Sequence, residues 1–226
     1  MSHLINNELI WVSIPKCASY SIEQALRSSK LKLETYDPNT ITDHGHVPLN
    51  ECLLTWGNKE TVCITRDWVH KWLSSLNFIW DKIEFESKYT PIRKWEDIDN
   101  KFIYKTFDTD FLNNLHLVDS EDVGAKSSFL KLVKKKYDPS KKIPAVMITL
   151  ISQKYFLSNK KCTYEFDISE IDKFIDFIED RFGERLIINH TNRTSKRPNK
   201  IIVNDELKSF IWENFEKRFE KGNHLI

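Results

Sequence analysis

The sequence is poor in glycine and has no long apolar run. Its 226 residues include only 5 glycines. The Walker A pattern GxxxxGK[ST] is absent, which excludes the phosphate loop of the common P-loop NTPases. No stretch approaches the roughly 18 apolar residues of a membrane-spanning helix. The N-terminal region also lacks a basic segment followed by a long apolar run. We therefore expect a cytoplasmic chain with neither a signal peptide nor a membrane partner.

Cysteine is scarce as well, and its spacing follows no known pattern. Without a CxxC pair, the spacing fits neither a zinc site nor a dense disulfide framework, so we predict no metal and expect reduced thiols. The 34 basic and 33 acidic side chains nearly cancel, which argues against a nucleic-acid partner and requires any anion site to be local. The four cysteines are Cys17, Cys52, Cys63 and Cys162.

Short apolar runs alternate with segments of helical periodicity, and together they predict the fold class. Such alternation favours an α/β fold, with a parallel sheet flanked by helices on both faces. The length suits a single domain over residues 1–226. The sequence predicts strands at 9–14, 30–36, 61–65 and 162–166, and helices around 22–26, 69–83, 169–182 and 205–221.

The segment Ile14–Ser21 (IPKCASYS) lies between a predicted strand and a predicted helix. A helix start exposes backbone N–H groups and the positive end of the helix dipole, and both suit an anion. Lys16 adds a charge, and Ser19 and Ser21 add hydroxyl donors. A plain strand-to-helix turn with serine caps and an exposed lysine would contain the same residue types.

A second strand-loop-helix unit carries Arg66 directly after the predicted strand 61–65, and Ser74 follows eight residues later. A guanidinium at the carboxyl end of a strand can hold a phosphate through two hydrogen bonds. A serine two turns into the helix can meet the same anion. The alternative is a surface arginine with an unrelated serine on the helix.

Two histidines, His44 and His46, flank Gly45 between these two units. No matching cluster of ligands nearby indicates a metal. A structural or solvated pair is one interpretation. The other is a general base, because neutral imidazole can accept a proton from a hydroxyl near pH 7.

Taken in order, these segments resemble the motifs of sulfotransferases that use PAPS (3′-phosphoadenosine 5′-phosphosulfate). Ile14–Ser21 is similar to the 5′-phosphosulfate loop [VI]-P-K-[TC]-[AG]-[ST]-[TS]-[ST], with Tyr20 in place of a small residue. Arg66–Ser74 is similar to the 3′-phosphate motif R-D-P-x-x-R-x-x-S, with Trp68 replacing the proline and Lys71 the second arginine.

The resemblance implies a P-loop-like sulfotransferase fold, PAPS as donor and PAP as product. It also implies that Lys16 neutralises charge on the leaving group, and that no metal is needed. The nucleotide-binding residues that it implies in the two motifs are Pro15, Lys16, Cys17, Ala18, Ser19, Tyr20, Ser21, Arg66 and Ser74.

The string His-Gly-His-Val looks like the active-site segment of the heparan sulfate and uronyl 2-O-sulfotransferases. That resemblance implies that His46 is the base and that His44 assists or binds the acceptor, a hydroxyl expected on a carbohydrate. If His46 is not the base, His44 or Glu23 is the next candidate.

The C-terminal half resembles the same family more weakly. Gln153–Leu157 (QKYFL) and Tyr164-Glu165 are similar to its Q-x-x-[FW]-[LI] and [YF]-E patterns. Residues 189–200 look like the basic loop that closes over the nucleotide, with Asn192, Arg193 and Lys196 as expected contacts. A kinase-like phosphoryl transferase and a non-catalytic glycan-binding module remain the alternative functions.

Overall fold

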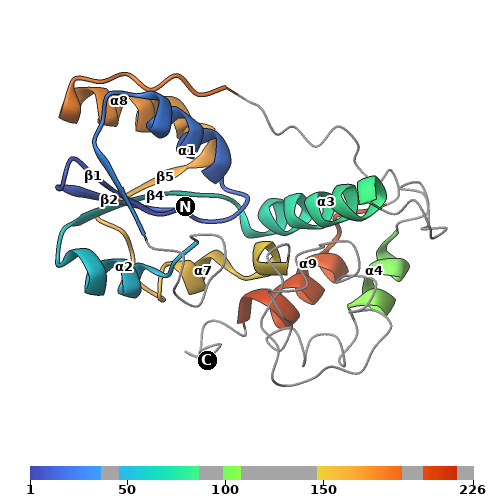
Figure 1. Ribbon diagram of the computed structural model, residues 1–226. Coiled ribbons are helices and arrows are strands. Elements are labelled where there is room, and N and C mark those ends of the chain that lie inside the picture. The colour runs from blue at the N-terminus through green and yellow to red at the C-terminus, as the bar shows by residue number, and fades with distance from the viewer. Residues whose placement is uncertain (37–45, 87–98, 108–146, 190–200, 218–226) are drawn as a thin grey trace. The chain divides into compact units, whose positions relative to one another are not determined.

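The computed structural model describes residues 1–36, 46–86, 99–107, 147–189 and 201–217 (Figure 1). The chain divides into two compact units. Unit 1 comprises Met1–Lys71 and Ser152–Arg193, and unit 2 comprises Trp72–Ile151 and Thr194–Ile226. That the two units form a single domain stays a prediction.

Unit 1 contains a five-stranded sheet with the strand order β3-β1-β2-β4-β5. Strands β2, β4 and β5 are parallel, as the sequence predicts, whereas β1 is antiparallel to both β2 and β3. The sheet is therefore mixed, and the expectation of a parallel sheet holds for only three of its strands. The strands are β1 (His3–Ile5), β2 (Leu9–Val12), β3 (Leu33–Thr35), β4 (Glu60–Thr65) and β5 (Tyr164–Asp167).

The antiparallel part begins with a hairpin that the sequence prediction missed. Asn6 and Asn7 both have left-handed backbone, with φ of 47° and 61°. The N–H of Glu8 donates to the carbonyl of Ile5 at 2.9 Å and closes the turn. Two left-handed central residues define the type I′ turn, which matches the twist of paired strands and accepts asparagine readily. The Asn-Asn pair between two apolar runs was the available signal.

Helices cover both faces of the sheet in unit 1. Helices α1 (Ser19–Ser28) and α8 (Ile171–Phe182) lie on one face, and α2 (Leu49–Trp56) lies on the other (Figure 1). The ring of Phe174 on α8 packs against the ring of Trp11 on β2, with centroids 5.4 Å apart. This arrangement confirms an α/β fold.

The predicted helices of unit 1 form, with one correction to their caps. Helix α8 ends at Gly183, whose left-handed backbone (φ 68°) is the expected stop signal. A serine just before the apolar periodicity predicts Ser169 as the cap at the start of this helix, and that prediction is wrong. The side chain of Asp167 accepts the N–H of Ser169, and Glu170 completes a capping box at the preceding 3₁₀ turn. Helix α2 was not predicted, and a short helix α7 spans Gln153–Phe156.

Unit 2 is helical over its described residues and has an aromatic core. The ring centroids of Trp72, Phe107 and Phe215 lie 5.4–5.7 Å from one another. The predicted last helix forms from Asp205, and residues 218–226 lie outside the described part. In the described part of the whole chain, no helix is both long and apolar enough to cross a membrane. The helices of unit 2 are α3 (Trp68–Glu86, from Trp72 onward), α4 (Asn100–Thr106), η3 (Met147–Leu150), α9 (Asp205–Ile211) and a π-helical turn, η5 (Trp212–Glu216).

Candidate functional site

The candidate site lies where the parallel strands of unit 1 end. Because β2, β4 and β5 are parallel neighbours, their carboxyl ends meet at one edge of the sheet. In open α/β sheets, ligands bind at this edge. The β2–α1 loop, defined here as Pro15–Ala18, follows β2, and Arg66 follows β4 directly. The two sequence motifs therefore start at the same edge.

The β2–α1 loop holds two residues in a backbone conformation that ordinary side chains rarely adopt. Lys16 and Ala18 have φ of 64° and 57°. Left-handed backbone costs about 1–2 kcal/mol per non-glycine residue. Strain of this kind is retained where the surroundings fix it and is concentrated at functional sites.

Helix α1 begins directly after Ala18, and no described side chain caps it with a hydrogen bond. The start of α3 and the 3₁₀ turn that leads into α8 differ, because an aspartate supplies an acceptor at each. The side chain of Asp67 accepts the N–H of His70 at 3.0 Å in α3. Asp167 does the same for Ser169 ahead of α8. The start of α1 is therefore the one of the three that no aspartate side chain caps in the described residues.

Basic groups surround the uncapped helix start. The Nη1 of Arg66 donates to the carbonyl oxygen of Lys16 at 3.3 Å, which joins the two motifs directly. The side chain of Lys71 is almost fully buried, with a relative exposure of 1%. Burial raises the pKa of the neighbouring Cys17 thiol to about 12, although the charges of Lys71, Arg66 and Lys16 act to lower it. Cys17 is therefore a neutral thiol, and three cations and the carboxylate of Asp167 lie close to it.

Gln153, the first residue of α7, links the two motifs. Its Oε1 accepts the backbone N–H of Arg66 at 3.2 Å, and its Nε2 donates to the carbonyl of Arg66 at 2.8 Å. The thiol of Cys17 also donates to Oε1, at 3.9 Å. Sequence reasoning noted this glutamine only as part of a pattern and gave it no role in the site. Its role depends on contacts between segments far apart in the chain.

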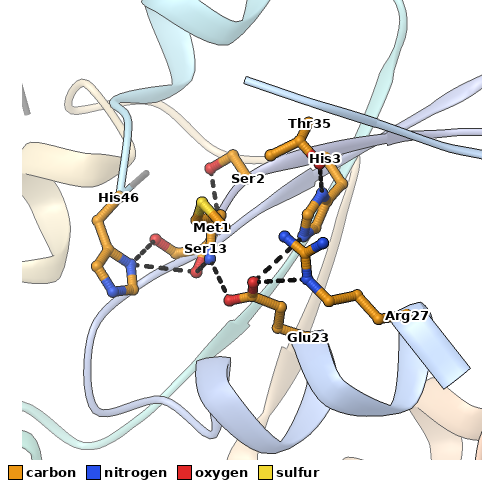
Figure 2. A network of polar contacts seen from close by, with 8 residues as sticks. All are labelled: Met1, Ser2, His3, Ser13, Glu23, Arg27, Thr35 and His46. Atoms are coloured by element: carbon orange, nitrogen blue, oxygen red, sulfur yellow. Dashed lines mark hydrogen bonds and ion pairs between the residues drawn. The ribbon is translucent and has the colours of Figure 1, made fainter. Parts of the chain in front are cut away.

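His46 lies at the end of β2, on the same side as the β2–α1 loop. Its Nδ1 is 2.9 Å from the carbonyl oxygen of Ser13 and 3.1 Å from the hydroxyl oxygen of the same residue (Figure 2). A carbonyl oxygen can only accept, so we assign the proton of the neutral ring to Nδ1. The lone pair then belongs to Nε2, the nitrogen through which this ring can act as a base.

The alternative base, Glu23, is held in ion pairs instead. Its carboxylate contacts the amino group of Met1 at 2.7 Å and Arg27 at 2.9 Å, and His3 lies 4.0 Å away (Figure 2). Burial acts to raise the pKa of Glu23, but the amino group and Arg27 outweigh it and hold the pKa below its usual value. A carboxylate with a lowered pKa is a weak base, and this disfavours Glu23.

The remaining predicted site residues fall into three groups. Pro15, in the loop, and Ser19, directly after it, are buried. Ser21 is half-buried, and the Tyr20 side chain is half exposed to solvent. Ser74 lies on α3 in unit 2, so its partnership with Arg66 stays a prediction. The predicted residues outside the described part of the chain are His44, Asn192, Arg193 and Lys196.

Comparison with known proteins adds no assignment to this geometry. No protein-family model matches the chain, and neither a curated protein nor a solved structure matches it.

Proposed function

We propose that this protein is a PAPS-dependent sulfotransferase that transfers a sulfuryl group to a hydroxyl, with a carbohydrate as the acceptor. The observation that carries the proposal is the hydrogen bond from the Arg66 guanidinium to the Lys16 carbonyl. It joins the segment that resembles the 3′-phosphate motif to the segment that resembles the 5′-phosphosulfate loop.

Binding of the donor is supported by the charge and geometry of the β2–α1 loop. PAPS carries phosphate groups at its 3′ and 5′ positions, so its site needs two groups of donors. The uncapped N–H groups of α1 and the Lys16 ammonium would receive the 5′ end. The Arg66 guanidinium would hold the 3′-phosphate through paired hydrogen bonds. The side chain of Gln153 fixes the backbone of Arg66 through two further hydrogen bonds.

The proposed fold is the P-loop-like sulfotransferase fold. It is supported by the central β2-β4-β5 arrangement, in which the first parallel strand leads through a strained loop into α1 and the second leads through an arginine into α3. The antiparallel strands β1 and β3 are an addition to this parallel core.

The proposed chemistry requires little covalent work from the protein. Bound PAPS supplies the sulfuryl group, whose sulfur forms a bond to the acceptor oxygen as its bond to the bridging oxygen breaks. Lys16 would stabilise the negative charge that develops on that bridging oxygen. His46 would take the acceptor's proton on Nε2, and the Ser13 carbonyl would hold the ring in the required tautomer.

Nucleotide-induced thermal stabilisation tests the donor assignment. PAP at 100 times its dissociation constant should stabilise the protein by about 2.7 kcal/mol. AMP, which lacks the 3′-phosphate, and ATP, which carries its extra phosphates at the 5′ end, should each stabilise it much less. Equal shifts with ATP and PAP would support a kinase-like phosphoryl transferase, and no shift with PAP would remove the proposal.

Transfer of labelled sulfate from PAPS to a panel of glycans tests the reaction itself. We expect transfer to at least one glycan that carries a free hydroxyl on a uronic acid. Tight PAP binding without transfer to any glycan, small alcohol or phenol would favour the non-catalytic glycan-binding alternative.

A further inference from the structure

A second group of chemically reactive side chains lies on β4 and β5, outside the residues of the proposed nucleotide site. Cys63 is in β4, three residues before Arg66, and its register partner in β5 is Glu165. Cys162 lies just before β5. Because the pairing of these two strands is parallel and in register, it brings residues together that are far apart in sequence.

The ligand atoms of these three residues are close enough to share one cation. The two Sγ atoms and a carboxylate oxygen of Glu165 all lie within 4.8 Å of one another. In a tetrahedral site, with metal–sulfur and metal–oxygen distances of about 2.0–2.3 Å, ligand atoms are roughly 3.3–3.8 Å apart. Rotamer adjustments that shorten each separation by at most about 1.0–1.5 Å would therefore complete the geometry.

The donor set selects the class of metal. Two sulfur ligands disfavour magnesium and calcium, which prefer oxygen, and suit zinc or another borderline or soft cation. The carboxylate adds an oxygen ligand that zinc accepts readily. Three protein ligands would leave a fourth position for water, as in open zinc sites.

A backbone hydrogen bond orients one ligand of the set. The backbone N–H of Cys162 donates to Oε1 of Glu165 at 2.9 Å, a contact that fixes the carboxylate as outer-shell hydrogen bonds do in metal sites. Both cysteines are buried, whereas Glu165 is exposed, so the carboxylate lies on the solvent side of the group.

We infer that Cys63, Cys162 and Glu165 form a binding site for a zinc-class divalent cation, with two thiolates and one carboxylate as ligands. The cation would tie β5 to β4 just before the strand end that carries Arg66. The inference is independent of the proposed sulfotransferase activity and does not place a metal in that reaction.

The protonation state of the thiols makes binding depend on pH. Each thiol must lose its proton to the solvent when it binds the cation. The affinity for the cation therefore rises with pH, and binding releases protons.

Cobalt(II) titration of the full chain, metal-free and reduced, tests the site. One equivalent of Co²⁺ should give thiolate-to-metal charge-transfer absorption in the near ultraviolet and the visible bands of a tetrahedral ion, and Zn²⁺ should abolish both. Loss of an outer-shell partner already lowers metal affinity about 10–100-fold. Cys63→Ser and Cys162→Ser should therefore lower it by roughly 100-fold or more. The matched control, Cys17→Ser, should keep the spectrum and the stoichiometry.

Absence of the charge-transfer band in the unmutated protein would overturn the inference, as would its persistence in both cysteine variants. If those variants fail to fold, Glu165→Gln provides the test, because it changes an exposed side chain and should lower the affinity roughly 10-fold. An unchanged affinity in that variant would also overturn the three-ligand site. Mass spectrometry that finds a Cys63–Cys162 disulfide, together with no cobalt uptake by the reduced chain, would assign the pair to redox chemistry instead.

Discussion

Two strand-to-helix connections of unit 1 occupy equivalent positions but are built differently. The β2–α1 loop and the segment after β5 both leave the carboxyl end of a parallel strand, and both lead to a helix on the same face of the sheet (Figure 1). After β5, a capping box of Asp167 and Glu170 satisfies the start of the turn. After β2, two left-handed residues lead into a helix start that no described side chain caps.

The difference shows which of the two connections suits a ligand. A capping carboxylate occupies the N–H groups of a helix start and repels a further anion, so the β5 connection contributes to stability. The β2–α1 loop keeps N–H donors, backbone strain and nearby cations together. Natural proteins accept such local costs mainly at functional sites. Changes beside the β2–α1 loop should therefore alter turnover or PAP affinity, whereas a change in the cap after β5 should alter stability alone.

The largest expected effect is on turnover, through the histidine at the end of β2. His46→Ala should lower sulfate transfer roughly 10²–10⁴-fold, because a positioned base contributes about that much. PAP affinity should stay nearly unchanged, because the ring would act on the acceptor. Transfer from labelled PAPS and calorimetric titration with PAP measure the two quantities. Near-normal transfer by the variant would exclude His46 as the base and direct attention to His44.

The next effect is on donor binding, through the arginine that contacts the β2–α1 loop. Arg66→Ala should weaken PAP binding by roughly 1.5–3 kcal/mol, the range for a hydrogen bond to a charged group. Arg185→Ala is the matched control, because Arg185 pairs with Asp176 and Glu179 on the surface of α8. That control should bind PAP normally. Calorimetry that finds equal affinities for both variants and the unmutated protein would remove the 3′-phosphate assignment.

A smaller effect should follow from loosening the link between the two motifs. Gln153→Leu removes the acceptor and donor that pair with the backbone of Arg66. We expect PAP affinity to fall by about 1 kcal/mol, the typical net value of a neutral hydrogen bond. Gln24→Leu, on the exposed face of α1, is the control. If only thermal stability falls and PAP affinity does not, Gln153 is structural and does not position Arg66.

The smallest effect on PAP binding should come from the cap after β5. Asp167→Ala should destabilise the fold by about 1 kcal/mol, the usual value of a helix cap, and should leave PAP affinity unchanged. The hydrogen bonds from the hydroxyl and N–H of Ser169, with the charge of Arg66, hold the pKa of Asp167 below its ordinary value.

That lowered pKa gives the sign of the pH dependence. Because the folded state binds the Asp167 proton less tightly than the unfolded chain does, the stabilisation is present above the unfolded pKa, about 3.9. It is lost as the pH falls through the folded pKa. Denaturant unfolding should therefore show that the unmutated protein has a larger free energy of unfolding than Asp167→Ala at neutral pH. This difference should disappear in acid. A difference in free energy of unfolding that grows in acid would contradict the assignment of Asp167 as a capping carboxylate.

Local sequence patterns predicted most of unit 1. The apolar runs before Pro15 and Arg66 form β2 and β4, and the helical spacing after them forms α1 and α3. The hairpin turn and the cap that the sequence prediction missed also have local signals. The Asn6-Asn7 pair is typical of a type I′ turn and Asp167 of a cap, but apolar periodicity alone indicates neither.

Contacts between distant segments were beyond prediction from sequence. The pairing of Gln153 with Arg66 and the hydrogen bond from His46 to Ser13 each join segments whose separation in the chain carries no information about their distance in space. These contacts show which atoms of the candidate residues lie close together.

The sequence by itself determined the strand-loop-helix units, the positions of Lys16 and Arg66 at strand ends, and the absence of a Walker A loop. Periodicity and loop chemistry are local, so a single chain segment is enough to read them. Only the tertiary structure decided that the sheet is mixed, and only it brought Cys63, Cys162 and Glu165 within reach of one cation. Strand order and register result from packing across the whole unit, which no single segment encodes.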